Sequence, residues 1–141
     1  MNNQKTPAIL IIGATGAIGK ELTKQLAAKD IPFRALIRKS EDAKLFPSTR
    51  GVELVEGDLA DANSILKATK GIERAFLLTN SSEQAEALQS GFVDIAEGAG
   101  VRYIVKQSQW AASHLSPVRF LRYHAAVEEH IKQLIWNSQA I

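Results

Sequence analysis

The feature that most constrains this sequence is a set of three evenly spaced glycines. The stretch LIIGATGAIGK places Gly13, Gly16 and Gly19 three residues apart, between an apolar run (8–12) and an amphipathic stretch (17–30). In a strand–loop–helix unit, such glycines allow a sharp turn, close approach of a pyrophosphate, and close packing of the helix on the sheet. Free N–H groups at the start of the helix attract the anion. The loop therefore predicts dinucleotide binding, and a tight turn without a ligand is the alternative.

The rest of the chain repeats this alternation of short apolar runs and amphipathic stretches. We expect strands at 8–12, 33–38, 52–57, 74–79 and 102–108, and helices at 17–30, 40–46, 61–71, 82–100 and 117–135. Strands separated by helices are parallel, and right-handed crossovers then give a doubly wound α/β sheet of Rossmann type. We expect the strand order 3-2-1-4-5, helices on both faces, and a single domain over residues 1–141. Trp110, an isolated aromatic after the fifth strand, is expected to fill the core.

Composition excludes several classes of function. Lys and Arg number 17 against 15 Asp and Glu, and the basic residues are scattered, so no nucleic-acid partner is expected. The chain has no cysteine, which rules out disulfides and thiolate nucleophiles. The N-terminus lacks a signal-peptide pattern and no apolar run is long enough to cross a membrane, so we expect a cytoplasmic protein. His114 and His130 show no ligand spacing, and no metal is expected.

Several further motifs fall in the order of one protein family. The glycine pattern GATGAIG resembles the short-chain dehydrogenase/reductase superfamily. The segments RALIRK, GDLAD, AFLLT, AGVRYIVKQS and RYHAAVEEHI are similar to its NmrA-like atypical branch, over about residues 8–134. This resemblance implies binding of NADP(H), in a family that includes redox sensors and quinone reductases.

The glycine loop and the end of the second strand supply the main expected cofactor contacts. The loop contacts are Gly13, Thr15, Gly16, Ala17, Ile18 and Gly19. The second strand ends in Arg38 and Lys39, where NAD-preferring folds carry an acid for the ribose 2′-OH. A guanidinium pairs with a 2′-phosphate, so we expect NADP(H) to be preferred over NAD(H). Two solvated surface cations are the alternative interpretation of Arg38 and Lys39.

Other strand ends supply further expected contacts, because the carboxyl ends of parallel strands face the ligand crevice. In the resembling family, Asp58 and Leu59 flank the adenine, although Asp58 or Asp61 could instead cap the following helix. Thr79 and Asn80 end the fourth strand, where the family places backbone contacts to the cofactor. Lys106, near the end of the fifth strand, is a further expected contact.

The proton-transfer group of conventional short-chain reductases is not encoded. Those enzymes use a Ser, and a Tyr four residues before a Lys. Aligned through the family's Lys-x-x-x-Glu, Glu128 puts His124 at the Lys position and Phe120 at the Tyr position, and Phe cannot transfer a proton. His124 and Ser108 remain catalytic candidates, although a partly buried polar residue is the plainer interpretation of His124. Tyr123, next to His124 in the helix, is expected to point elsewhere.

The last residues differ from the resembling family, which continues with a sixth strand and a substrate lobe. Here the chain reads IKQLIWNSQAI, in which no sixth strand is recognisable, and this apolar tail could cover the open edge of the fifth strand in the same chain or a neighbour. Three functions follow. The first is an NADP(H)-binding domain with a redox-sensing, regulatory or minimal reductase role, acting through a protein partner. The second is an NADPH-dependent quinone or carbonyl oxidoreductase that is completed by dimerisation. The third is a truncated, non-functional reductase fragment.

Overall fold

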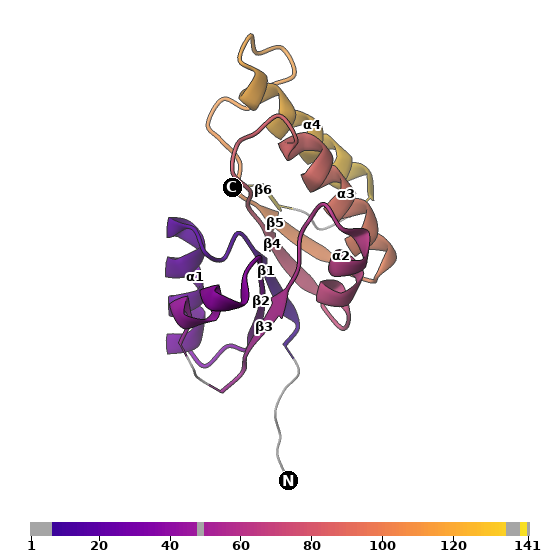
Figure 1. Cartoon of the computed structure of the whole chain (residues 1–141). Coiled ribbons are helices and arrows are strands. Elements are labelled where there is room, and N and C mark those ends of the chain that lie inside the picture. Colours follow the sequence, from indigo (N-terminus) through magenta and orange to yellow (C-terminus); the bar gives the residue numbers. More distant parts are fainter. Residues whose placement is uncertain (1–6, 48–49, 135–138, 141) are drawn as a thin grey trace.

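The computed structural model describes residues 7–47, 50–134 and 139–140, and its centre is a parallel sheet (Figure 1). The strands are β1 (Ile9–Ile12), β2 (Phe33–Ile37), β3 (Val52–Glu56), β4 (Arg74–Leu77), β5 (Tyr103–Lys106) and β6 (Gln139–Ala140). Their order is β3-β2-β1-β4-β5-β6, which confirms the predicted order of the first five. The sixth strand was not recognised in the sequence. It pairs with β5 through Val105 and Lys106, so Gln139 and Ala140 of the tail cover part of that edge within the same chain.

The strand register brings the carboxyl ends of the strands to one edge of the sheet. Ile12 of β1 pairs with Leu77 of β4, which pairs in turn with Lys106 of β5. On the other side of β1, the last residue of β2, Ile37, pairs with Glu56 of β3. The segments that follow each strand, among them the glycine loop, therefore meet at this edge.

Helices cover both faces of the sheet, as predicted. They are α1 (Ala17–Ala28), η1 (Ser40–Leu45), α2 (Ala62–Thr69), α3 (Ala85–Gly98) and α4 (Arg119–Leu134). Figure 1 shows α1 on one face and α2, α3 and α4 on the other. Asp61 caps α2 by accepting a hydrogen bond from the N–H of Asn63 at 2.9 Å. The expected helix at 40–46 is a 3₁₀ helix with Lys39 at its N-cap.

The core lies in two apolar layers, one on each face. Leu10, Leu77, Ile104 and Phe92 belong to the layer beneath α2, α3 and α4. A second layer, against α1 and η1, includes Ile11, Phe33, Phe46 and Phe76. Successive strand residues thus point to opposite layers, as the pleat of a strand requires.

Trp110 and Ile18 are among the apolar residues that lie outside this core. Trp110 is 97% exposed, so the expectation that it fills the core is wrong. It sits in the segment between β5 and α4, whereas the fully buried aromatic positions are taken by Phe33 and Phe92. Ile18 has helical spacing with Leu22 and Leu26 but is 49% exposed, because it lies in the first turn of α1 beside the glycine loop.

A buried arginine ties the sheet to α2. The Arg34 guanidinium donates to the backbone oxygens of Ala68 at 2.7 Å and Lys70 at 2.8 Å. Its Nε also pairs with Glu53 on β3 at 3.0 Å. Burying a charge is favourable only where partners satisfy it, and here the end of α2 supplies two of them.

Candidate functional site at the carboxyl edge of the sheet

Two of the three loop glycines are required by the fold itself. Gly13 has φ +85°, and a Cβ there would lie 2.4 Å from the backbone oxygen of Leu78. A Cβ on Gly19 would lie 2.1 Å from the oxygen of Gly13 and 2.6 Å from the Cα of Ala14. All of these neighbours are backbone atoms, which cannot rotate away. Gly13 therefore allows the turn and Gly19 allows the close approach of α1, as predicted.

Gly16 is different, because nothing in the fold requires a glycine there. Its φ is −76°, which any residue can adopt, and an added Cβ would meet only the oxygen of Gly13 at 3.7 Å, an ordinary contact. Gly16 is exposed at the N-cap of α1, flanked by half-buried Thr15 and exposed Ala17. Among the described residues, the N–H groups of Ala17 and Ile18 have no hydrogen-bond acceptor. The start of α1 therefore presents free backbone N–H donors at the positive end of the helix dipole.

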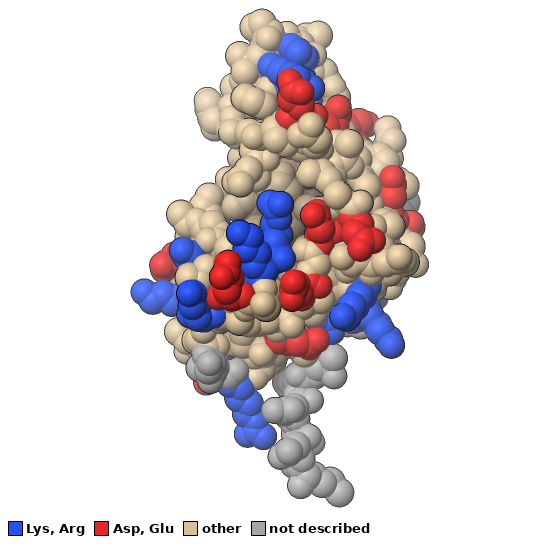
Figure 2. All heavy atoms as spheres, in the orientation of Figure 1, with Lys and Arg blue, Asp and Glu red and all other residues tan. Residues whose placement is uncertain are grey.

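Arg38 and Lys39 follow β2 at the same edge, and both are exposed. Neither side chain makes a hydrogen bond or an ion pair with any residue that the structure describes. Their charges are therefore available to a ligand, in contrast to the charge of Arg34. Figure 2 shows Lys and Arg interspersed with Asp and Glu on the face that it draws, rather than one extended basic area.

The ends of β3 and β4 place the other predicted contacts. Asp58 is exposed and accepts a hydrogen bond from the N–H of Ala60 at 2.8 Å, while Asp61 caps α2. Of the two aspartates offered as the helix cap, Asp61 is the one that caps α2, and the adenine contact of Asp58 stays a prediction. Leu59 packs against the core layer beneath α2, and Asn80 is exposed.

Thr79 has a partner that the sequence did not suggest. Its Oγ1 accepts a hydrogen bond from Gln89 Nε2 at 2.7 Å. Gln89 is buried in α3, and its Oε1 is the buried side-chain atom without a partner among the described residues. Because Thr79 accepts from Gln89, its own hydroxyl proton is free to be donated at the carboxyl edge.

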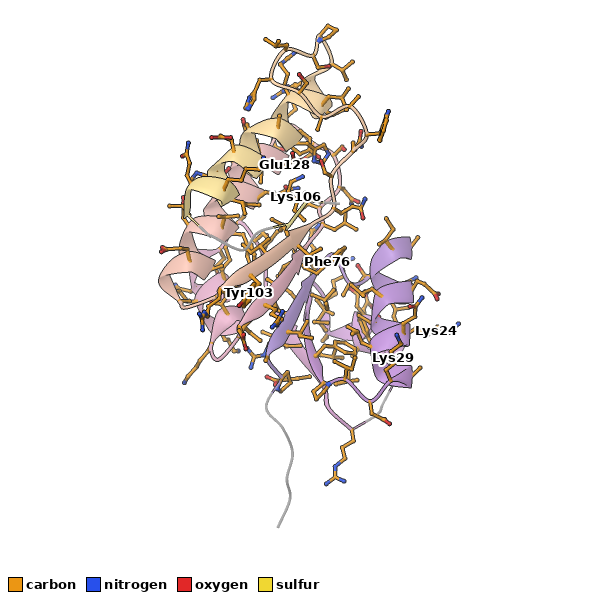
Figure 3. All side chains as sticks on the ribbon, turned by 180° about the vertical axis from the view of Figure 1, so that it is seen from behind. Lys24, Lys29, Phe76, Tyr103, Lys106 and Glu128 are labelled. Atoms are coloured by element: carbon orange, nitrogen blue, oxygen red, sulfur yellow. The ribbon has the colours of Figure 1, made fainter. Side chains whose placement is uncertain are left out.

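A cluster of four polar side chains lies between β5 and α4. Lys106 has no exposed surface, and its Nζ is 2.6 Å from Nδ1 of His124 and 3.9 Å from a carboxylate oxygen of Glu128. Ser108 donates its hydroxyl hydrogen to that same carboxylate. Figure 3 shows Lys106 and Glu128 beside each other in this layer. The side chain of Lys106 is thus directed beneath α4, while Ser108 lies half-buried at the edge.

Burial and mutual charge set the protonation of this cluster. Burial lowers the pKa of Lys106 to about 8, and the Glu128 carboxylate opposes that effect. Burial also lowers the pKa of His124 to about 4; the Lys106 ammonium adds to this decrease and Glu128 opposes it. At neutral pH, Lys106 is mostly protonated and His124 is neutral.

Tyr123 belongs to the same region, although we expected it to point away from His124. The two rings lie 4.2 Å apart between centroids, tilted by 33°, so that expectation is wrong. Adjacent side chains in a helix diverge at Cβ, but both rings are buried under the same layer and meet there. The Tyr123 hydroxyl is 3.4 Å from Ser81 Oγ and faces a cavity of about 360 Å³ between α3 and α4. Phe120 is 41% exposed, at the edge of the Tyr123 ring.

Comparison with known proteins assigns the chain to a family. The model of the NmrA-like family matches residues 5–139. The chain belongs to the NmrA-like family. Among its relatives, the NAD(P)H azoreductase of Xenophilus azovorans is 28% identical over 125 residues, which cover 89% of this chain and 43% of that protein. The (4-alkanoyl-5-oxo-2,5-dihydrofuran-3-yl)methyl phosphate reductase of Streptomyces griseus is 37% identical over 103 residues, covering 73% of this chain and 35% of that reductase.

A solved protein of similar structure carries a dinucleotide. The crystal structure of the Citrobacter sp. triphenylmethane reductase, complexed with NADP(H), superimposes with a TM-score of 0.75 at 26% identity. The match covers 89% of this chain and 45% of the reductase. This NmrA-like chain therefore spans less than half the length of the relatives named here.

Metal and membrane features were also sought in the part of this NmrA-like chain that the structure describes. In residues 7–47, 50–134 and 139–140, no three His, Asp or Glu side chains are placed to hold a metal ion. His130 does have an acidic neighbour that its spacing did not suggest: its Nε2 lies 2.6 Å from Asp94 and links α4 to α3. No helix in the described ranges has the length and apolarity to cross a membrane.

Proposed function

We propose that this NmrA-like chain binds NADP(H), with the pyrophosphate over the glycine loop and the 2′-phosphate at Arg38 and Lys39. Gly16 carries the proposal. A glycine that neither the backbone angles nor the packing requires, exposed among free N–H donors, is best explained by a ligand that approaches the backbone there. A methyl group at this position would occupy the space of the pyrophosphate.

The preference for NADP(H) follows from the charges beside the loop. Arg38 and Lys39 are exposed and have no partner among the described residues, and the next acidic residue along the chain is Glu41. A doubly charged 2′-phosphate gains more from two free cations than an uncharged 2′-OH does. The further proposed contacts around the dinucleotide are Gly13, Thr15, Ala17, Ile18, Gly19, Asp58, Leu59, Thr79 and Asn80; Lys106, which has no exposed surface, is not among them. The Xenophilus relative is an NAD(P)H azoreductase and the Citrobacter reductase is complexed with NADP(H), which supports the cofactor class.

Reduction of an acceptor is the second part of the proposal, because the relatives named above are reductases. NADPH, when bound, supplies a hydride. Phe120 cannot supply the matching proton, so we propose an acceptor whose reduced form is a stabilised anion that takes its proton from water, as a quinone does. The alternative is a sensing role, in which the chain binds the dinucleotide through the same residues but reduces no acceptor.

The binding proposal is tested by calorimetric titration of NADPH and NADH into the wild-type chain and three variants. Gly16→Ala is expected to stay folded and to lose measurable binding of both dinucleotides. Arg38→Ala is expected to weaken NADPH binding by roughly tenfold or more, the loss of one charge-assisted pair, and to leave NADH binding unchanged. Lys24→Ala removes an exposed cation that points away from the sheet on α1 (Figure 3) and is the control, with wild-type affinities.

The outcomes separate the loop from the phosphate contact. A Gly16→Ala chain that binds NADPH like the wild type would contradict the assignment of the loop. Equal losses for NADPH and NADH in Arg38→Ala would contradict the 2′-phosphate contact but not the loop. Single-turnover oxidation of bound NADPH by a simple quinone then tests reduction, and its absence would leave binding without catalysis.

A further inference from the structure

The Lys106–His124 contact fixes which atom donates and which accepts. Lys106 Nζ and His124 Nδ1 are 2.6 Å apart, and both residues are buried. An ammonium group has donors and no acceptor, so Nδ1 must be the acceptor. A neutral imidazole carries one hydrogen, and it therefore resides on Nε2, on the far side of the ring from Lys106. The strand thus determines the tautomer of a helix residue.

The surrounding charges support the neutral form of His124. On α4, Glu128 faces the cluster and accepts from Ser108, and Tyr123 stacks on the imidazole through its ring. On β5, Lys106 is the charged neighbour. On α3, which packs against α4, Asp94 pairs with His130. In the cavity beyond Tyr123, Glu83 pairs with Arg119, and Glu86, Arg122 and His114 also line the wall.

We propose that Lys106 is a positioning residue for the cofactor site: by hydrogen bonding to Nδ1 it holds His124 as a neutral imidazole that presents its Nε2–H to a ribose oxygen of the bound dinucleotide. This inference rests on the proposed function for the identity of the ligand. Lys106 has no exposed surface and cannot touch a ligand itself, whereas His124 retains 4% of its surface. The effect of Lys106 must therefore pass through His124.

The inference also accounts for the substitution at the family's Lys position. His124 takes that position on α4, yet a lysine ammonium still lies 2.6 Å away because β5 supplies one. The Lys106 ammonium thus keeps a positive charge at this point of the site, and the neutral imidazole of His124 becomes the donor nearest the ligand. Glu128 balances the Lys106 charge, and Ser108 donates a hydrogen bond to the same carboxylate.

The test is a pH titration of the His124 ring by ¹⁵N NMR, with its resonances assigned by their loss in His124→Gln. In the wild type we expect a midpoint near pH 4 and, at pH 7, the chemical shifts of an Nε2–H tautomer. Lys106→Met removes both the charge and the donor, and the midpoint should rise by roughly one pH unit or more, because Glu128 then acts on His124 unopposed. Lys106→Gln keeps an amide donor without the charge, so the midpoint should rise while the Nε2–H tautomer persists.

Dinucleotide affinity at pH 7 supplies the second measurement. Lys106→Met is expected to weaken NADPH binding roughly tenfold, about the value of one hydrogen bond in a dry site, and Lys106→Gln to restore most of it. A merely structural Lys106 would not give this rescue. A titration midpoint of wild-type His124 near 6.5, the ordinary pKa of a histidine, would overturn the inference without any variant. Equal losses of affinity in the Met and Gln variants would also overturn it.

Failure of the proposed function gives a different result. A wild-type chain that binds no NADPH would contradict both the function and the ligand assigned to His124. The ¹⁵N titration would in that case still show whether Lys106 controls the protonation of His124, so the two failures are distinguishable.

Discussion

Acid should destabilise this fold through His124 in a measurable and specific way. His124 is nearly fully buried, and its pKa in the folded chain is about 4, against 6.5 for an exposed histidine. Between these values the unfolded chain binds a proton that the folded chain does not. The stability that depends on neutral His124 is therefore complete above pH 6.5 and is lost as the pH falls towards 4.

The size of the effect follows from the two pKa values. Each unit of difference corresponds to about 1.4 kcal/mol at full separation of the two protonation states. Integrated from pH 7, the loss of unfolding free energy attributable to His124 is about 2 kcal/mol at pH 5 and about 3 kcal/mol at pH 4. Against a typical domain stability of about 5–15 kcal/mol, this is a substantial fraction.

The assay is urea unfolding, followed by circular dichroism, at pH 4, 5, 6 and 7 for the wild type and His124→Gln. Glutamine can still accept from Lys106 and donate on its other side, but it does not titrate. Carboxylates that lose their charge in acid affect both proteins alike, so the difference between the two curves isolates His124. Parallel curves over this range would refute the reasoning, because they would mean that His124 protonates equally in the folded and unfolded chain.

Three substitutions test other parts of the structure by the same unfolding assay at pH 7. Gly19→Ala places a Cβ 2.1 Å from the Gly13 oxygen, so we expect a loss of about 2–3 kcal/mol or more from the displaced loop; an unchanged midpoint would contradict the packing of α1. Asp61→Ala removes the cap on the N–H of Asn63 and should cost about 1 kcal/mol, whereas Asp61→Asn should cost little. Arg34→Met leaves two backbone oxygens at the end of α2 without their donor, and should cost about 3 kcal/mol; a neutral result would mean that water replaces the guanidinium.

The sheet was predictable because its signal is local. Each of the first five strands is a short apolar run between polar segments, and the helices between the strands determine that they are parallel. The ends were less accurate: β4 stops at Leu77 and β5 at Lys106, two residues earlier than expected in each case. β6 could not be predicted, because two residues have no periodicity and the pairing depends on contact with β5.

The parts of the candidate site that could be predicted are those formed by residues of a single short segment. The glycine spacing identified the loop, and the residues after β2 identified Arg38 and Lys39. The Lys106–His124 bond joins residues 18 positions apart on different elements. Strand alternation places Lys106 on the same face as Ile104, but in a sheet with both faces covered this does not tell which helix lies above it. The contact between Gln89 and Thr79 did have a signal in the sequence, because Gln89 is a polar residue on the buried side of α3.

The three loop glycines show most clearly what structure adds to a motif. Identical spacing gives them equal weight in the sequence, yet Gly13 and Gly19 are held by contacts with backbone atoms and would be needed in any protein with this turn. Only Gly16 has space for a methyl group in the fold and so depends on something outside it. A glycine motif therefore supports ligand binding through its one position that folding does not explain. Gly→Ala at a position of ordinary φ stabilises by about 0.4–1 kcal/mol through the unfolded chain. Gly16 is also the N-cap of α1, where alanine is less favourable than glycine by a similar amount, so Gly16→Ala should change the free energy of unfolding by less than about 1 kcal/mol. A variant that keeps nearly the stability of the wild type and cannot bind would show that a ligand, and not the fold, needs this glycine, as the proposed function requires.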